Sequence, residues 1–226
     1  MIIPCTRNME LLKHTLFINL DHRPDRLTHA TAEFNKIGID GIVERFPGIL
    51  TTAGNVGCTL SHIKCLEIAI ERNYPQIFIC EDDITFTNPP LFMENLTKLY
   101  QSSIEWDVLV VGGNTVPQFS KINDYCVRTF NVQTTTGYIV KQHYYNTLLQ
   151  NFREGIQLLL KNPHRKTEFC IDIYWKKLQQ QHMWILLMPL TVTQYEDYSD
   201  IEKRVVNYHN IMLDFEKKYL QQYLFK

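Results

Sequence analysis

Apolar and polar positions along the chain fall into blocks that predict strands followed by helices. Residues 15–20 have the continuous apolar pattern of a buried strand, and from Pro24 apolar residues recur at helical spacing. A short strand is predicted at residues 42–46 and a second helix at residues 58–72. We expect the buried stripe of this second helix to consist of Leu60, Ile63, Leu66 and Ile70.

The same alternation continues through the middle of the chain. Residues 77–80 form an apolar strand, a helix is predicted from Pro89 to about residue 100, and residues 107–111 form another strand. Strands that alternate with helices favour right-handed crossovers and a parallel sheet. The pattern therefore predicts an α/β fold, Rossmann-like, with a mostly parallel central sheet that binds ligands at the carboxyl ends of its strands.

The second half of the chain mixes strands with longer helices and has no repeat or linker that would mark a boundary. We therefore expect one domain over residues 1–226, and an amphipathic docking helix in its last part. The predicted elements are strands at 125–131, 136–140 and 184–188 and helices at 142–160, 170–181 and 209–226.

Charge and cysteine usage narrow the class of partner and the compartment. Lys and Arg total 23 against 24 Asp and Glu, so the formal net charge is −1, and no run of basic residues builds a face for nucleic acid. The six cysteines are scattered without a C-x-x-C pair, which is typical of reduced core residues. Because the N-terminus lacks a signal-peptide pattern and no apolar run reaches about 18 residues, we expect a soluble cytoplasmic protein without a transmembrane segment.

Three adjacent carboxylates follow the strand at residues 77–80. Glu81, Asp82 and Asp83 would repel one another unless a cation were present, and a hard divalent ion with oxygen ligands is the best candidate. We predict Asp83 as the direct metal ligand, Glu81 as an inner ligand or support, and Asp82 as a ribose or second metal contact. The alternative is that these residues only cap a turn.

Two other nucleotide-binding signatures are absent from the sequence. An acidic pair after an apolar strand also occurs in P-loop proteins, but those require a Gly-Lys pair, and the chain has none. The G-x-G-x-x-G fingerprint of dinucleotide-binding oxidoreductases is missing too.

An ordered set of motifs resembles glycosyltransferase family 25, which includes bacterial lipooligosaccharide galactosyltransferases and procollagen hydroxylysine galactosyltransferases. The motifs are F-I-N-L-D-H-R-P-D-R-L at 17–27, G-C-T-L-S-H-I-K-C-L-E at 57–67, E-D-D at 81–83, T-T-T-G-Y-I-V at 134–140 and Q-Y-E-D-Y-S-D-I at 194–201. The resemblance implies a GT-A fold, a UDP-sugar donor, Mn²⁺ (or Mg²⁺) and an inverting transfer to a hydroxyl. It also implies a nucleotide-binding half at about residues 14–115 and an acceptor-side half at about 116–226.

The resemblance places the N-terminal motif around the nucleotide. It implies that Asn19, Leu20 and Arg26 contact the donor, and the carboxyl end of the first strand suits this role because Arg26 could hydrogen-bond a base or phosphate there. The alternative for Arg26 is a solvated charge on a helix face. Asp21 and Arg23 are interpreted as residues that shape the turn.

The second motif is expected near the start of the second helix, where free N–H groups and the helix dipole suit an anionic ligand. We predict that Ser61 contacts the donor and that Lys64 reaches its diphosphate. His62 is interpreted as a buried structural histidine, since no spacing supports a zinc site. Cys58 and Cys65 are interpreted as core residues.

An inverting transfer needs a general base for the acceptor hydroxyl. We predict Asp172, supported by Glu168 four residues earlier; the alternative is that both carboxylates only stabilise a helix N-terminus. By resemblance, Gly137 and its neighbours would lie near the sugar, and Gln194 would belong to a late segment that closes over the site. A late metal ligand at Asp197, Asp200 or His209 is left open.

The sequence thus predicts an inverting, metal-dependent hexosyltransferase that moves galactose or glucose from a UDP-sugar to a glycan or a collagen-like hydroxylysine. The motifs are shared by enzymes with either acceptor, and oligomerisation is left open. Residue usage hints at an AT-rich genome, bacterial or viral. Two alternatives stay open: a catalytically silent binding or scaffold subunit, and a metal-dependent phosphoesterase, which would require a paired metal site.

Overall fold

The computed structural model describes residues 10–115 and 118–217. Its centre is an eight-stranded sheet. In spatial order the strands are β2 (Val43–Pro47), β1 (Thr15–Asn19), β3 (Gln76–Glu81), β8 (Val132–Lys141), β5 (Val108–Thr115), β9 (Trp184–Leu187), β7 (Cys126–Thr129) and β6 (Phe119–Lys121). Six of these strands run in one direction, whereas β8 and β7 run in the other, as their antiparallel pairings show. The predicted α/β fold with a mostly parallel sheet is confirmed.

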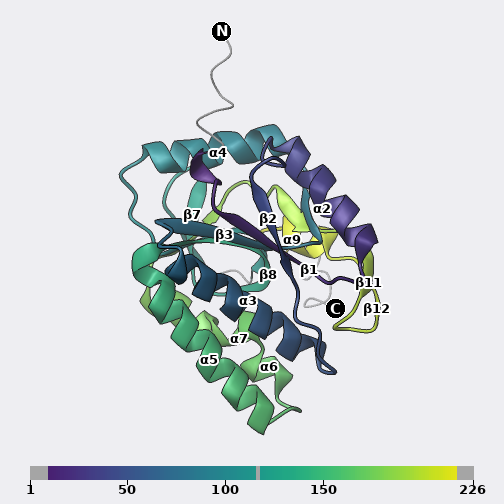
Figure 1. Ribbon diagram of the computed structural model, residues 1–226. Coiled ribbons are helices and arrows are strands. Elements are labelled where there is room, and N and C mark those ends of the chain that lie inside the picture. The colour runs from purple at the N-terminus through teal and green to yellow at the C-terminus, as the bar shows by residue number, and fades with distance from the viewer. Residues whose placement is uncertain (1–9, 116–117, 218–226) are drawn as a thin grey trace, which may run out of the picture.

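Helices cover both faces of this sheet, so the molecule has three layers (Figure 1). Helices α2 (Pro24–Lys36) and α4 (Pro89–Gln101) pack on one face, and α3 (Gly54–Glu71) and α5 (Tyr145–Lys161) pack on the other. Each layer has its own apolar cluster, because alternate residues of a strand point to opposite faces. The remaining helical segments are η1 (Gln142–Tyr144), α6 (Lys166–Phe169), α7 (Ile171–Tyr174), α8 (Lys176–Gln181) and α9 (His209–Leu213).

Two small antiparallel sheets were not predicted from the sequence. One joins β4 (Ile84–Phe86) to β10 (Val192–Gln194), and the other is the hairpin of β11 (Asp197–Ser199) and β12 (Arg204–Val206). Strands of three residues carry too short a pattern for period-2 analysis. The first small sheet brings the late part of the chain next to the acidic cluster, since Gln194 pairs with Ile84.

Several predicted helix boundaries are wrong. Helix α3 begins at Gly54 rather than at residue 58, and Ile70, which was predicted to be buried, is 39% exposed. The buried side of α3 instead includes polar residues near its start, which belong to the cavity described below. The helix predicted over 170–181 is divided between α7 and α8. Of the helix predicted over 209–226, α9 covers the first part, and residues 218–226 lie outside the described residues.

Strand β8 runs against its neighbours β3 and β5, and this direction positions the site. Because it is antiparallel, its first residues lie beside the carboxyl ends of β3 and β5, with Gly137 paired to Cys80. Just before this pairing, Thr134 has a positive φ of 76°, which is unusual for a residue with a branched Cβ. The next residue, Thr135, donates a hydrogen bond from its hydroxyl to Glu81 at the end of β3.

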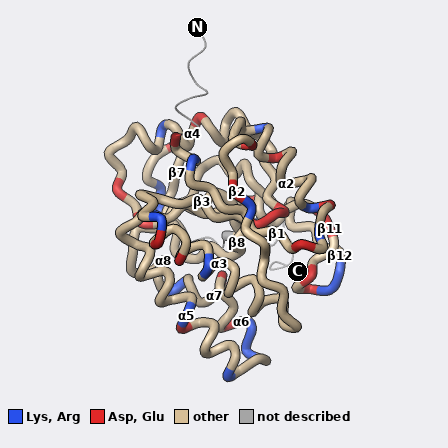
Figure 2. Tube along the Cα trace, in the orientation of Figure 1, with Lys and Arg blue, Asp and Glu red and all other residues tan. Residues whose placement is uncertain are grey.

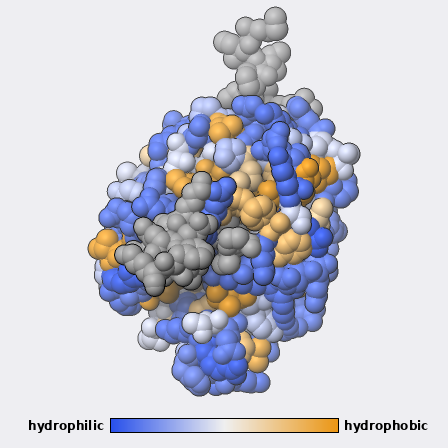
Figure 3. All heavy atoms as spheres, turned by 180° about the vertical axis from the view of Figure 1, so that it is seen from behind, coloured by the Kyte–Doolittle hydropathy of each residue, from blue (hydrophilic) through white to orange (hydrophobic). Residues whose placement is uncertain are grey.

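Most of the cysteines that the structure describes are buried, as the sequence predicts. The five cysteines that the structure describes are free, and Cys65, Cys80 and Cys126 are buried as predicted. Among the described residues, no helix combines the length and apolar character needed to cross a membrane. On the face shown in Figure 3, hydrophobic side chains gather in small patches among hydrophilic ones.

Candidate active site

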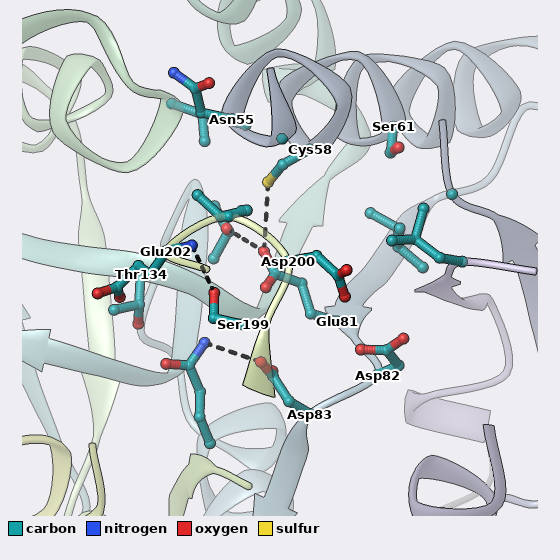
Figure 4. Close-up of a pocket in the computed structure, with 18 of the residues that line it drawn as sticks. Asn55, Cys58, Ser61, Glu81, Asp82, Asp83, Thr134, Ser199, Asp200 and Glu202 are labelled. Atoms are coloured by element: carbon teal, nitrogen blue, oxygen red, sulfur yellow. Dashed lines mark hydrogen bonds between the residues drawn. The ribbon is translucent and has the colours of Figure 1, made fainter. Parts of the chain in front are cut away.

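A cavity of about 390 Å³ lies at the carboxyl ends of β1 and β3. Its walls come from these strand ends, the first turns of α3, the start of β8, α7 and the β11–β12 hairpin. This is where an open α/β sheet is expected to bind its ligand. The acidic cluster that ends β3 lines the cavity, together with residues from distant parts of the sequence (Figure 4).

Asp82 is held by polar side chains from the N-terminal motif. Asn19 Nδ2 donates to Asp82 Oδ2 at 2.7 Å, and Arg26 Nη1 lies 3.0 Å from Asp82 Oδ1. Asn19 also accepts a hydrogen bond from Arg45 Nε at 2.8 Å, so its amide is oriented on both sides. Burial raises the pKa of Asp82, although Arg26 and Asn19 favour its ionised form.

Asp83 has a carboxylate oxygen without a partner. Its Oδ2 lies 3.4 Å from Gln194 Nε2 and 3.4 Å from Arg26 Nη1, whereas its Oδ1 is buried and no described group bonds to it. Burial and the neighbouring charges of Glu81 and Asp82 raise the pKa of Asp83 to about 8. An unsatisfied buried carboxylate is costly unless a cation or proton is added.

Glu81 points to a different group of residues from Asp83. Its Oε1 accepts a hydrogen bond from the Thr135 hydroxyl, lies 3.2 Å from His62 Nε2 and lies 3.7 Å from Cys58 Sγ (Figure 4). Burial alone would raise the pKa of Glu81, but the hydrogen bond and electrostatic attraction of His62 outweigh it and lower this pKa. The predicted shared role of Glu81 and Asp83 as ligands of one metal therefore has no support in their contacts.

Asp172 faces the cavity from α7. Its Oδ2 accepts a hydrogen bond from the backbone N–H of Thr134 at 3.1 Å. Burial raises the pKa of Asp172, with a further contribution from the charge of Glu81. The left-handed backbone of Thr134 is the kind of local strain that persists where surrounding contacts fix it, and here it aims an N–H group at Asp172.

Ion pairs attach the β11–β12 hairpin to the start of α2. Arg23 Nη1 donates to Asp200 Oδ2 at 2.8 Å and to the Tyr198 carbonyl at 3.1 Å, and its guanidinium also contacts Asp197. Arg26 Nε adds a bond to Asp197 at 3.2 Å. Figure 2 shows charged residues of both signs gathered at this hairpin. Arg23, interpreted from the sequence as a turn residue, thus fastens one side of the cavity.

The structure brings most of the predicted site residues together. Asn19 lies behind the wall and positions Asp82 rather than lining the cavity. The predicted residues that line the cavity are Leu20, Arg26, Ser61, Glu81, Asp82, Asp83, Asp172 and Gln194.

Three predicted site residues lie elsewhere. Lys64 is exposed and pairs with Glu67, because it lies ten residues after the start of α3 at Gly54, beyond the first turns that line the cavity. Glu168 is exposed and pairs with Arg165 rather than with Asp172. Gly137 is buried in β8, where an added Cβ would lie 2.8 Å from Val111 Cγ2, so it serves strand packing.

Ser61 and His62 have structural partners. Ser61 Oγ donates to the Gly57 carbonyl and accepts from the Ile49 N–H, both at 2.8 Å, so it fixes the loop before α3. His62 is fully buried, and its Nδ1 lies 2.8 Å from Tyr138 Oη. His62 is buried and hydrogen-bonded, as interpreted from the sequence, and both it and Cys58, interpreted as a core residue, line the cavity.

Several cavity residues were not found by sequence reasoning. Asn55 precedes the expected start of α3, Thr134 lies near the start of β8, before the strand predicted at 136–140, and Cys170 lies directly before α7. Tyr208 follows the hairpin that the sequence did not predict. The only available signal was the grouping of Asn, Thr and Cys near helix starts, which is also common in ordinary turns.

Comparison with known families identifies the group to which the chain belongs. The family described as "Glycosyltransferase family 25 (LPS biosynthesis protein)" matches residues 47–163, which is more than half of the chain. The chain therefore belongs to glycosyltransferase family 25, and the resemblance of its motifs is confirmed.

Curated relatives are much longer than this chain. A "Glycosyltransferase 25 family member" of Anopheles gambiae is 24% identical over 206 residues, which cover 76% of this chain and 32% of the relative. An "Inactive glycosyltransferase 25 family member 3" of Homo sapiens is also 24% identical, and the match covers 67% of this chain and 25% of the relative. The chain spans a third or less of the length of these relatives.

Among solved structures, one similar chain is a UDP-glucose pyrophosphorylase complexed with UDP-glucose. The TM-score is 0.49 and the identity 10%, and the match covers 78% of this chain and 90% of that one.

Proposed function

We propose that the chain is a metal-dependent glycosyltransferase that moves a hexose, galactose or glucose, from a UDP-sugar to a hydroxyl of a glycan or a hydroxylysine. Membership of glycosyltransferase family 25 supports glycosyl transfer as the reaction. The observation that best supports a bound metal ion and an anionic donor is the buried, unpartnered Oδ1 of Asp83 in a cavity lined by more acidic than basic residues.

The charge of the cavity supports the need for a cation. Arg23, Arg26 and Lys203 are its basic lining residues, and the acidic ones are Glu81, Asp82, Asp83, Asp172, Asp200 and Glu202. With all of them ionised the lining carries three more negative than positive charges. A nucleoside diphosphate would be repelled from such a cavity unless a divalent ion compensated for it.

Asp83 fits the role of metal ligand best. Carboxylate oxygens are the preferred ligands of Mn²⁺ and Mg²⁺, and Asp83 has a free oxygen, whereas Asp82 is already held by Asn19 and Arg26. When bound there, the ion would neutralise the charge on the leaving diphosphate. Gln194 would orient the Asp83 carboxylate through its bond to Oδ2.

The other side of the cavity supplies the candidate base. Asp172 is buried, and its raised pKa makes its carboxylate a stronger base. The Thr134 N–H orients its carboxylate. In the proposed step, the proton of the acceptor hydroxyl moves to Asp172 as the hydroxyl oxygen forms the new bond to the anomeric carbon, while the bond from that carbon to the diphosphate oxygen breaks and UDP leaves with its electron pair. Arg26 and Leu20 would hold the nucleotide on the opposite side.

A catalytically silent, nucleotide-binding role is the second candidate. Arg26 contacts both Asp82 and Asp83, so part of the acidic charge is already compensated within the chain. In addition, one relative is named as inactive. The charge excess and the free oxygen of Asp83 favour the metal-dependent enzyme over this role, and also over a phosphoesterase with a basic substrate groove.

The first experiment is calorimetric titration of the purified chain with UDP, UDP-glucose, UDP-galactose, ADP and GDP, in Mn²⁺ and then in a chelator. We expect Mn²⁺-dependent binding of the uridine compounds alone, followed by slow donor hydrolysis or transfer in a product assay. Binding without any turnover of donor over a panel of acceptors would favour the silent role. Absence of binding by a folded chain would contradict both.

A further inference from the structure

Three potential metal ligands meet on the floor of the cavity, away from Asp83. Cys58 and His62 lie one helical turn apart on α3, and both face Glu81 at the end of β3. Cys58 Sγ, His62 Nε2 and Glu81 Oε1 all lie within 4.8 Å of one another. Sequence spacing did not predict this cluster, because the third ligand lies on a different element, 19 residues after His62.

Two of the three separations between these atoms are close to those of a tetrahedral zinc site. Zn–S bonds of about 2.3 Å and Zn–N and Zn–O bonds of about 2.0–2.2 Å put neighbouring ligand atoms roughly 3.3–3.6 Å apart. Here Sγ lies 3.7 Å and Nε2 lies 3.2 Å from Glu81 Oε1. An ion could therefore be bound with only small movements of the three side chains.

Outer hydrogen bonds orient two of the three ligands. Tyr138 Oη lies 2.8 Å from His62 Nδ1, which fixes the ring and leaves Nε2 directed at Glu81. The Thr135 hydroxyl bonds to the Glu81 carboxylate. Support of this kind for a histidine and a carboxylate is typical of metal sites, where it sets ring orientation and ligand basicity.

All three ligands also line the cavity, so a bound ion would keep one coordination position open toward it. We propose that Cys58, His62 and Glu81 form a binding site for Zn²⁺, distinct from the oxygen site at Asp83. The thiolate and imidazole select zinc or cobalt, whereas the carboxylate of Asp83 suits manganese or magnesium. This proposal does not depend on glycosyl transfer.

The test is titration of the reduced, metal-free chain with Co²⁺, followed by absorption spectroscopy. We expect one equivalent to produce a sulfur-to-cobalt charge-transfer band that added Zn²⁺ removes. Cys58→Ser should abolish the band, and Tyr138→Phe should weaken Co²⁺ affinity about 10- to 100-fold. Circular dichroism of each variant checks that it is folded.

Two control variants separate this site from others. Cys65→Ser changes a buried cysteine on the same helix and should leave the band unchanged. Asp83→Asn should also leave it unchanged, even if that variant no longer binds Mn²⁺ and donor, so failure of the proposed function would not affect the result. Absence of a charge-transfer band, or a band that persists in folded Cys58→Ser, would overturn the proposal.

Discussion

The cavity has two walls of different chemistry. The acidic wall consists of Asp82, Asp83, Arg26, Arg23 and the β11–β12 hairpin, and it is held by ion pairs between segments far apart in the sequence. The helical wall consists of Cys58, His62, Glu81, Thr135 and Asp172 from α3, β3, β8 and α7, and it contains no Lys or Arg among the cavity residues that the structure describes.

The different chemistry of the two walls indicates which part of a transfer reaction each wall would support. On the acidic wall Arg26 already pairs with Asp82 and Asp83, so an incoming cation and diphosphate can exchange partners with these charges. On the helical wall, the Asp172 carboxylate accepts a backbone N–H instead of pairing with an arginine, and burial raises its pKa. We therefore expect donor binding to depend on the acidic wall and proton transfer on the helical wall.

The largest effect should come from Asp83→Asn. Loss of the candidate ligand carboxylate should lower kcat/KM on the order of 10³-fold and abolish Mn²⁺-dependent donor binding, because several kcal/mol of charge stabilisation is removed. Steady-state kinetics and calorimetry measure both quantities. The matched control is Asp124→Asn, a fully exposed carboxylate on the β6–β7 turn, which should change neither. Full activity in folded Asp83→Asn would refute the metal assignment.

Asp172→Asn should separate the contribution of the helical wall to catalysis from that of the acidic wall to donor binding. We expect kcat to fall about 10²-fold, as is usual for loss of a general base, while UDP-sugar affinity stays within about twofold. Glu168→Gln, four residues earlier and exposed, is the control and should be silent. If donor affinity fell as far as kcat, Asp172 would belong to donor binding rather than to proton transfer.

Arg23→Gln should loosen the hairpin without removing a ligand. The lost bonds to Asp200 and the Tyr198 carbonyl should raise the donor KM about tenfold, with a smaller change in kcat. Hydrogen exchange of residues 197–206 should become faster. Arg204→Gln alters an exposed pair within the same hairpin and serves as the control. Unchanged exchange in Arg23→Gln would show that the hairpin is held by other contacts.

A separate prediction concerns pH and stability. The pKa of Asp83 is raised from 3.8 to about 8, so between about pH 4 and pH 8 the folded chain binds more protons than the unfolded chain. The stability that protonated Asp83 contributes is therefore lost as pH rises through this range. Asp83→Asn cannot ionise. Without divalent ions, its stability relative to the parent chain should therefore increase over this window. Thermal unfolding in chelator measures the difference, and a difference independent of pH would contradict the shift.

Sequence patterns predicted the sheet better than the site. Continuous apolar runs mark β1, β3 and β9 because these strands are buried on both faces. The acidic residues after β3 can be recognised in the sequence because they directly follow such a run. The site also depends on side-chain direction, which changes with a shift of one residue in a helix. Lys64 is one example, since it lies on the exposed side of α3, whereas Ser61 on the same helix is buried. Contacts such as Cys58 with Glu81 depend on packing between elements, and no local pattern encodes them.

The antiparallel strand β8 has a consequence for how the chain folds. It lies between β3 and β5, so these two strands, which are complete by residue 115, have no direct pairing in the sheet. A chain that ends before residue 132 would lack β8 and β9, so β5 would have no partner in the sheet and β3 would have one open edge. During synthesis the first half must therefore wait for residues 132–141, and fragments shorter than this are expected to aggregate rather than fold.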